Sequence, residues 1–276
     1  MKTYLPALVA ILLLVATSSC SKEEDTPAPA VACYVSKVSM EDEQQTSYTN
    51  YTYDDKLRLV LSGSQIKFAV GGRDTITQAL FLKYVYDKRG SITETQLSVA
   101  EEGPFSPYQK FFHDAKGNVV RYEVFYSGNN PEKVQEYCDF TYNAGSQLLT
   151  ERYYNNGLDF TVITRHRNYH YTDGQMTRME YLDGNEKKFA EDRFTYSSYA
   201  NPYIGGIGEN KTRTGTGASS NYLIASSTRY DENGNPQKQG SYDNHFTISP
   251  DGKVEEVVSV YQDGKRSVRR FTYTCN

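Results

Sequence analysis

Tryptophan is absent from this 276-residue chain, which has only four cysteines, four methionines and four histidines. The lack of tryptophan removes the side chain that sugar-binding platforms favour most. Beyond residue 15 no apolar run approaches the roughly 20 residues that a membrane-spanning helix requires. A formal net charge of −4 argues against binding to nucleic acid through charge alone.

Motifs for catalysis are missing as well. No Gly-x-Ser-x-Gly sequence occurs, and no cysteine lies near a histidine in a recognisable catalytic setting. The glycine-rich stretch 205–208 has no following Lys-Ser/Thr and no strand-to-helix context, so it does not predict a phosphate loop. We therefore predict no catalytic residues and no cofactor.

Carboxylates leave one enzymatic alternative open, a glycan hydrolase. Such an enzyme needs two carboxyl groups about 5–10 Å apart in a cleft. Most aspartates here fall in predicted turns, and Glu123 and Asp139 are expected to face solvent. If the strands form a barrel, its mouth could bring two carboxylates together, so this alternative stays open.

Two histidines, His166 and His170, lie four residues apart on a predicted strand. Four strand residues span about 13 Å, which is too far for both rings to bind one zinc ion. We predict no metal site and expect the histidines to lie at the surface.

The first thirty residues predict an export signal and a tether. Lys2, an apolar run over 5–15 and small residues up to position 19 are typical of a secretory signal peptide, 1–19. The segment ending at Cys20 resembles the lipobox of bacterial lipoproteins, although Thr17 stands where leucine is usual. The resemblance implies a lipid on Cys20 that anchors the chain in a membrane. The alternative is an ordinary secretory signal with an incidental cysteine.

Residues 20–30 continue with an acidic run and a Pro/Ala stretch, which predicts a semi-extended tether. The acidic run is similar to the surface-export signal of Bacteroidetes lipoproteins. A plain solvated linker is the equal alternative. We expect an outer-membrane lipoprotein on the cell surface or on the periplasmic face, followed by a single domain over 31–276.

The remaining cysteines allow at most one disulfide within the chain. Cys33 opens the predicted domain and Cys275 nearly closes it, so a bridge between them would tie the first strand to the last. Export makes a disulfide chemically permitted. Three buried free thiols, with Cys138 among them, are the alternative.

A repeated phrase organises the domain: two aromatic residues at i and i+2, an Asp or Asn, a turn, and an alternating apolar stretch. Copies begin at Tyr84, Phe111, Phe140 and Tyr169, the one at Phe140 being looser, and the clearest Asp-to-Gly turn, 230–236, follows a single tyrosine. The first four turn glycines, at 90, 117, 145 and 174, recur at steps of 27–29 residues, and second turns fall between them. Each repeat therefore predicts two strands and two turns.

This pattern predicts an all-β fold of about 16–18 antiparallel strands in a meander. A sheet of that width must curl, close or split, and closure also removes exposed edges. We predict a closed or nearly closed barrel, with an open curved or split sheet as the alternative. Tyrosine, with 25 copies, is expected to form aromatic ladders between strands.

Two resemblances follow from these motifs. The Tyr-Asp-x-x-Gly phrase, best seen over 86–92 and 230–236, is similar to the YD repeat of Rhs-type shells. The whole plan, with lipobox, YD-like hairpins and the Asn201-Pro202-Tyr203 element before a long loop, resembles a Bacteroidales family of lipoproteins described as a domain of unknown function with a porin-like fold. The resemblance implies a fold and no activity. A true pore is not expected, because the faces opposite the aromatics carry side chains such as Lys83 and Arg121.

Three tyrosines stand apart from the repeats. Tyr199, Tyr203 and Tyr222 flank or lie within the stretch 197–220, which breaks the repeat rhythm. Long loops of this kind are often functional, so these residues are the predicted ligand-contact loop. We expect a non-catalytic binding module for a glycan or a protein partner, with an envelope scaffold as the alternative.

Overall fold

A computed structural model describes residues 33–43, 45–70, 73–125, 133–155, 160, 163–202 and 221–275. Within these ranges the chain forms sixteen β-strands, and none of it is helical, so no helix there is suited to crossing a membrane. The strands are β1 Cys33–Asp42, β2 Gln45–Tyr53, β3 Leu59–Val70, β4 Arg73–Tyr86, β5 Ile92–Ser98, β6 Ser106–His113, β7 Val119–Val124, β8 Glu136–Tyr142, β9 Leu148–Asn155, β10 Ile163–Thr172, β11 Gln175–Leu182, β12 Lys188–Ala200, β13 Tyr222–Asp231, β14 Pro236–Ile248, β15 Val254–Tyr261 and β16 Arg266–Cys275.

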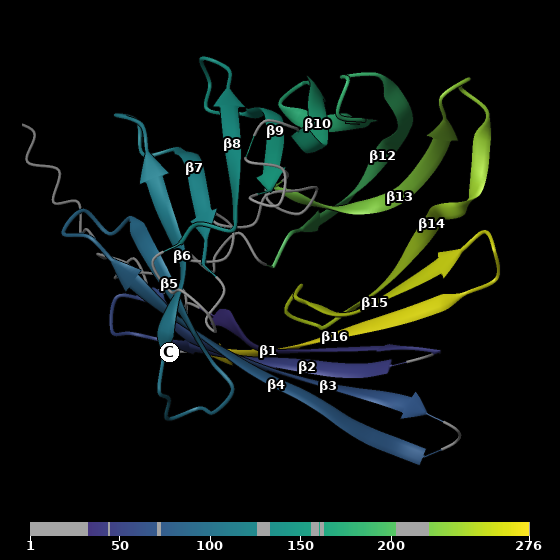
Figure 1. Ribbon diagram of the computed structural model, residues 1–276. Helices are drawn as coiled ribbons and strands as arrows, with labels where there is room; N and C mark the ends of the chain where they lie inside the picture. Colours follow the sequence, from purple (N-terminus) through teal and green to yellow (C-terminus); the bar gives the residue numbers. More distant parts are fainter. Residues whose placement is uncertain are drawn as a thin grey trace, which may run out of the picture. The chain divides into compact units, whose positions relative to one another are not determined.

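Every strand pairs antiparallel with its neighbours in the sequence, and β1 pairs with β16 to complete a closed barrel. In Figure 1 the first four and last three strands form one side of the barrel, and β7–β13 form the other. The predicted closed meander is confirmed, and the open or split sheet is wrong. Closure leaves no edge strand in the barrel, which removes the usual site of edge-to-edge aggregation.

Eight five-residue turns share one backbone pattern. The first residue donates its N–H to the fifth carbonyl, and the fourth donates its N–H to the first carbonyl. In six of them the first residue is Asp or Asn, and its side-chain oxygen accepts the N–H groups of the third and fifth residues. The turns span 54–58, 87–91, 114–118, 143–147, 183–187, 231–235, 249–253 and 261–265.

The fourth turn residue always has a positive φ, which favours glycine. Glycine occupies this position in five turns, whereas Leu57, Ser146 and Glu186 hold it in the other three, with φ of 58°, 62° and 61°. The third repeat therefore differs from the expected pattern. Its glycine, Gly145, comes one residue too early, and Ser146 adopts the left-handed conformation.

A β-bulge follows many of these turns and decides which residues face inward. In the β8–β9 pair Tyr142 lies opposite Leu148, while Thr141 lies opposite Thr150, so Leu149 is an extra residue. Leu148 and Glu151 are consequently both buried, although they are three residues apart. The extra residue shifts the alternation of the strand by one position.

Five tyrosine hydroxyls link one hairpin to the next. Each tyrosine lies near the end of an even-numbered strand and donates to a carbonyl near the start of the preceding strand. The pairs are Tyr53 to Val35, Tyr86 to Leu59, Tyr142 to Val119, Tyr196 to Met176 and Tyr273 to Val254, at 2.6–2.9 Å. The tyrosines therefore contribute hydrogen bonds as well as ring packing. Each bond joins two paired strands at the disulfide-bonded end of the barrel, where the two strands continue into different turns.

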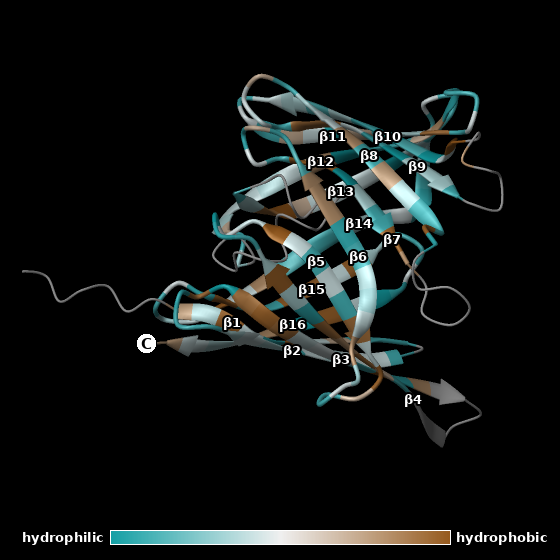
Figure 2. Cartoon of the chain, turned by 60° about the vertical axis from the view of Figure 1, so that its left-hand side comes forward, coloured by the Kyte–Doolittle hydropathy of each residue, from teal (hydrophilic) through white to brown (hydrophobic). Residues whose placement is uncertain are grey.

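The two ends of the barrel differ in what lines the interior. At the end that carries the turns 54–58, 87–91, 114–118 and 143–147, here called the disulfide end, the innermost side chains belong to one hydrophobic core. They include Val35, Tyr53, Leu59, Tyr86, Ile92, Val119, Tyr142, Leu148, Tyr171, Met176, Tyr196, Ile248, Val254 and Tyr273. Towards the opposite end, here called the polar end, charged and hydroxyl side chains replace them on β9–β16. Figure 2 shows hydrophobic and hydrophilic segments alternating along single strands.

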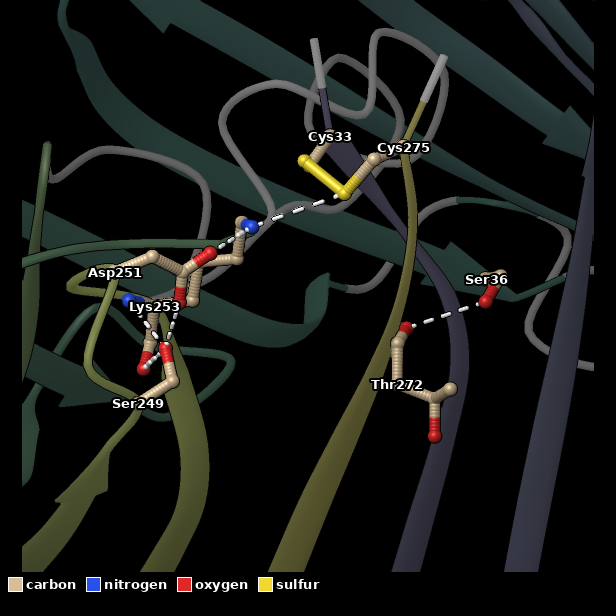
Figure 3. Close-up of a disulfide and its surroundings, with 7 residues drawn as sticks. All are labelled: Cys33, Ser36, Ser249, Asp251, Lys253, Thr272 and Cys275. Carbon is tan, nitrogen blue, oxygen red and sulfur yellow. Dashed lines mark hydrogen bonds and ion pairs between the residues drawn. A yellow bond between two sulfur atoms is a disulfide. The ribbon is translucent and has the colours of Figure 1, made fainter. Parts of the chain in front are cut away.

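Cys33 and Cys275 are register partners on β1 and β16 and are joined by a disulfide (Figure 3). The Lys253 ammonium lies 3.7 Å from the Cys275 sulfur and also contacts Asp251. Cys138 is a free thiol with no exposed surface, and burial raises its pKa. The signal peptide, Cys20 and the tether lie outside the described residues.

Candidate functional site

The inner face of β9–β16 near the polar end gathers most of the inward-facing charge of the described barrel. We call this surface the inner polar wall. Its members are Glu151, Tyr153, Arg165, Arg167, Tyr181, Asp192, Arg229, Tyr242, Tyr261 and Arg269. Register places them together, because Arg167 lies opposite both Glu151 and Tyr181, and Asp192 lies opposite Arg229.

Glu151 is fully buried in this wall, with 0% of its surface exposed. Its Oε2 accepts hydrogen bonds from the Arg167 guanidinium at 3.1 Å and from the Tyr153 hydroxyl at 3.3 Å. Its Oε1 accepts no hydrogen bond of ordinary geometry from the described residues, although the Tyr169 hydroxyl is close enough that burial and the Glu151 carboxylate together raise its pKa. A buried carboxylate with an unfilled acceptor is costly unless water or a ligand donates to it.

Asp192 forms the second acidic point of the wall. The Tyr181 hydroxyl donates to its Oδ2 at 2.7 Å, and the Arg229 guanidinium approaches its Oδ1 only to 3.8 Å. Burial raises the pKa of Asp192 above its ordinary value. The Tyr181 ring lies against two guanidinium groups, with centroid distances of 4.7 Å to Arg229 and 5.6 Å to Arg167. The ring and the two cations together form one side of the wall.

A pocket of about 260 Å³ continues the wall onto β15, β16 and β1. Tyr261 and Arg269 line it, together with Met40, Asp42, Glu43, Lys265, Arg266 and Ser267. The Tyr261 ring packs on the Tyr242 ring at 5.4 Å, which connects this pocket to the region near Asp192. Burial, with the negative charge of Asp192 nearby, raises the pKa of Tyr242 to about 12.

The wall offers three kinds of contact at once: ring faces, guanidinium donors and carboxylate acceptors. This combination matches a ligand with both C–H surfaces and hydroxyl groups, because rings cover apolar faces while charged groups make the stronger hydrogen bonds. Within the described residues no group of three His, Cys, Asp or Glu side chains is suited to a metal ion.

The three predicted loop tyrosines lie elsewhere. Tyr199 at the end of β12 and Tyr222 at the start of β13 are about 40% exposed, at the disulfide end of the barrel. Tyr199 packs on Phe246 with a centroid distance of 5.4 Å, and Tyr222 pairs with Ala200. Tyr203 lies outside the described residues. The inner polar wall includes none of the three.

The expectation of surface histidines is wrong for His166. Only 3% of its surface is exposed, because Arg152, Leu182 and Glu186 surround it on the outer face of the barrel. Burial lowers its pKa. His170 is partly exposed and pairs with Glu180 at 3.0 Å, so the two rings have separate partners.

The solvent-facing role predicted for Asp139 agrees with its position on the outer face. Its carboxylate accepts two hydrogen bonds from Arg121, at 2.6 and 2.9 Å, and both side chains remain partly exposed.

The inner polar wall was not predicted from the sequence, although a signal for it exists. Four of its charged residues precede a buried aromatic residue by two positions and therefore share its face. These pairs are Glu151 and Tyr153, Arg167 and Tyr169, Asp192 and Phe194, and Arg269 and Phe271. The aromatic residues of the repeat thus indicate the inner face. A charged residue in place of the first aromatic residue of a pair therefore indicates a polar site on that face.

Comparison with solved structures places the barrel in a known fold. It is similar to a porin-like protein from Bacteroides uniformis, with a TM-score of 0.55 and 14% sequence identity, over 88% of this chain and 98% of that one. A porin-like protein from Bacteroides vulgatus matches equally well, with a TM-score of 0.55 and 11% identity, over 88% of this chain and 99% of that one. No family model and no curated protein sequence matches the chain. At such identities the likeness establishes the fold alone.

Proposed function

We propose that this protein is an envelope lipoprotein, anchored through Cys20, whose barrel binds a glycan at the inner polar wall. The division of the interior carries the proposal. The disulfide end, where the chain enters the barrel at Cys33, is filled by hydrophobic side chains. The charged and aromatic wall lies towards the other end of the barrel, away from Cys33.

The chemistry of the wall favours a sugar over an apolar ligand. Tyr181, Tyr242 and Tyr261 supply ring surfaces beside charged groups. Asp192 keeps one carboxylate oxygen without a hydrogen bond from the described residues, so it can accept from a ligand hydroxyl. Hydrogen bonds to charged groups are stronger than those between neutral groups. A ligand that donates to a buried, unsatisfied acceptor also removes the free-energy cost of leaving that acceptor without a partner.

Binding of the purified protein to a glycan array, followed by calorimetric titration of the best ligand, tests the proposal. Arg229→Gln should weaken binding about 10-fold or more, because it removes a charged donor from the wall. Arg178→Gln is the matched control, since Arg178 lies on the outer face of β11, two strands away from β13, where it pairs with Glu180. Binding of no glycan above background, or equal loss in both variants, would contradict the proposal.

The anchor has its own test. Cells that express the protein should incorporate labelled palmitate into it, and Cys20→Ala should abolish the label. The same variant should leave the urea unfolding midpoint of the barrel unchanged, because all sixteen strands lie within 33–275. Label that persists in the variant would show that the lipid is not attached at Cys20.

A further inference from the structure

Arginines recur along the inner polar wall at intervals of three strands. Arg165 and Arg167 lie on β10, Arg229 lies on β13 and Arg269 lies on β16. Neighbouring strands are about 4.8 Å apart, so three strands correspond to about 14 Å along the wall. Guanidinium groups therefore line a stretch much longer than a single sugar ring.

These arginines differ in how far the protein neutralises them. Arg167 is paired with buried Glu151, and Arg229 faces Asp192 at the long distance of 3.8 Å. Arg165 and Arg269 make no ion pair with any residue of the described ranges. Two positive charges of the wall are thus left for a partner, in a protein whose formal net charge is −4.

The unpaired arginines are also placed for recognition. The Arg165 guanidinium lies over the Tyr153 ring, 3.7 Å from its centroid, which orients the group. Arg269 lines the 260 Å³ pocket beside Tyr261, where Lys265 and Arg266 add two cations and Asp42 and Glu43 add two carboxylates, so cations outnumber carboxylates by one. Both positions combine a ring surface with a guanidinium that has no carboxylate partner.

Two buried carboxylates show which donor groups the ligand must also carry. Glu151 and Asp192 are each more than nine-tenths buried, and each has one carboxylate oxygen that receives no hydrogen bond of ordinary geometry from the described residues. These oxygens need donors, whereas the unpaired arginines need acceptors. A ligand with hydroxyl groups and negative charges supplies both.

We infer that the glycan bound at the inner polar wall is an anionic oligosaccharide, with carboxylate or sulfate groups that pair with Arg165 and Arg269. This inference rests on the proposed function and specifies its ligand. Because the two arginines lie on β10 and β16, six strands apart in the closed sheet, contacts to both require several linked sugars, so the ligand is a chain rather than a monosaccharide. Its hydroxyls donate towards the acidic points of the wall.

Calorimetry with four probes tests the inference: a hexagalacturonate for carboxylates alone, a chondroitin sulfate hexasaccharide for sulfates together with carboxylates, neutral maltohexaose, and monomeric galacturonate. We expect at least one anionic hexamer to bind about 10-fold or more tightly than maltohexaose and galacturonate. Its affinity should fall as salt rises from 50 to 500 mM, because added ions screen charge pairing.

Neighbouring arginines on β16 provide the matched variants. Arg269→Gln removes an inward guanidinium without leaving a carboxylate unpaired, and it should weaken the anionic hexamer about 10-fold. Arg270→Gln changes the next residue, which faces outward and pairs with Glu41 and Glu256, and it should change affinity less than 2-fold. Arg165→Gln should act like Arg269→Gln.

The results distinguish the proposed function, glycan binding at the inner polar wall, from the inference that the glycan is anionic. Tighter binding of an anionic hexamer, lost in the Arg269 variant and kept in the Arg270 variant, supports the inference. Maltohexaose bound as tightly as both anionic hexamers overturns it, but leaves the proposed function standing if Arg229→Gln still weakens binding. Equal effects of the Arg269 and Arg270 variants also overturn it. No binding of any glycan overturns both.

Discussion

The tyrosine-to-carbonyl bonds between hairpins can be isolated at Tyr86. Its hydroxyl donates at 2.7 Å to the carbonyl of Leu59, a residue with 1% of its surface exposed. Tyr86→Phe removes only this hydroxyl, because the ring that packs against the Arg58 guanidinium at 4.8 Å is kept. The variant therefore measures the hydrogen bond with little change in packing.

The expected loss of stability in Tyr86→Phe depends on the Leu59 carbonyl, which loses its hydrogen-bond donor. A typical hydrogen bond contributes about 1 kcal/mol to stability, and a buried carbonyl left without this partner adds to the loss. We expect Tyr86→Phe to lower the free energy of unfolding by about 1.5–2 kcal/mol. For a domain of this size that corresponds to a decrease of roughly 4–6 °C in Tm.

Urea unfolding followed by circular dichroism measures the change, and Tyr48→Phe is the control. Tyr48 donates to the Gln65 side chain at an exposed position, so its loss should cost less than about 0.5 kcal/mol. The double variant Tyr86→Phe and Tyr142→Phe should be nearly additive, since the two sites are far apart along the sheet. Equal effects of Tyr86→Phe and Tyr48→Phe would refute the claim that the tyrosine-to-carbonyl bonds stabilise the barrel.

Three further predictions concern the closure and the turns. Replacing both Cys33 and Cys275 by serine should lower the free energy of unfolding by about 5 kcal/mol, since the bridge closes a loop with a sequence separation of 242, and an unchanged urea midpoint would contradict this. Ser146→Gly should raise the free energy of unfolding by about 1 kcal/mol, because it relieves a positive φ, whereas Gly117→Ala at the equivalent position should lower it by a similar amount; thermal unfolding distinguishes the signs. Stability should fall below about pH 4, because backbone N–H groups hold the pKa of turn carboxylates such as Asp87 below the ordinary value, so the stabilisation present above that value is lost as pH falls through the lowered pKa. Asp87→Asn should reduce this pH dependence of the urea midpoint, as Asn143 makes the same turn bonds without titrating.

The strands and the closure of the barrel could be predicted because the repeat carries its own signals. Aromatic pairs such as Tyr84 and Tyr86 share one face, and the following Asp87 and Gly90 satisfy a tight turn. These requirements involve residues close together in the chain, so a sequence pattern is sufficient to predict them. The number of strands then follows from counting turns.

The inner polar wall depends on a feature that is not local. Alternation counted from Leu148 would place Glu151 outside, but the bulge at Leu149 reverses the count and buries it. The approach of Arg167 and Tyr181 to the same region depends on pairing between strands, not on their own neighbours in the chain. Counting from the turn alone therefore assigns Glu151 to the wrong face, and which charged residues of different strands meet could not be assigned until the register was known.

The bond between Cys33 and Cys275 makes the barrel a covalent ring of sixteen strands. In most sheets, loss of structure starts at a terminal strand, which frays because one of its ends is unattached. Here the two terminal strands hold each other at their outermost residues, so neither can peel away alone. Opening must instead begin inside the ring, at a connection between two strands, and a protease that reaches the barrel would have to cut it there.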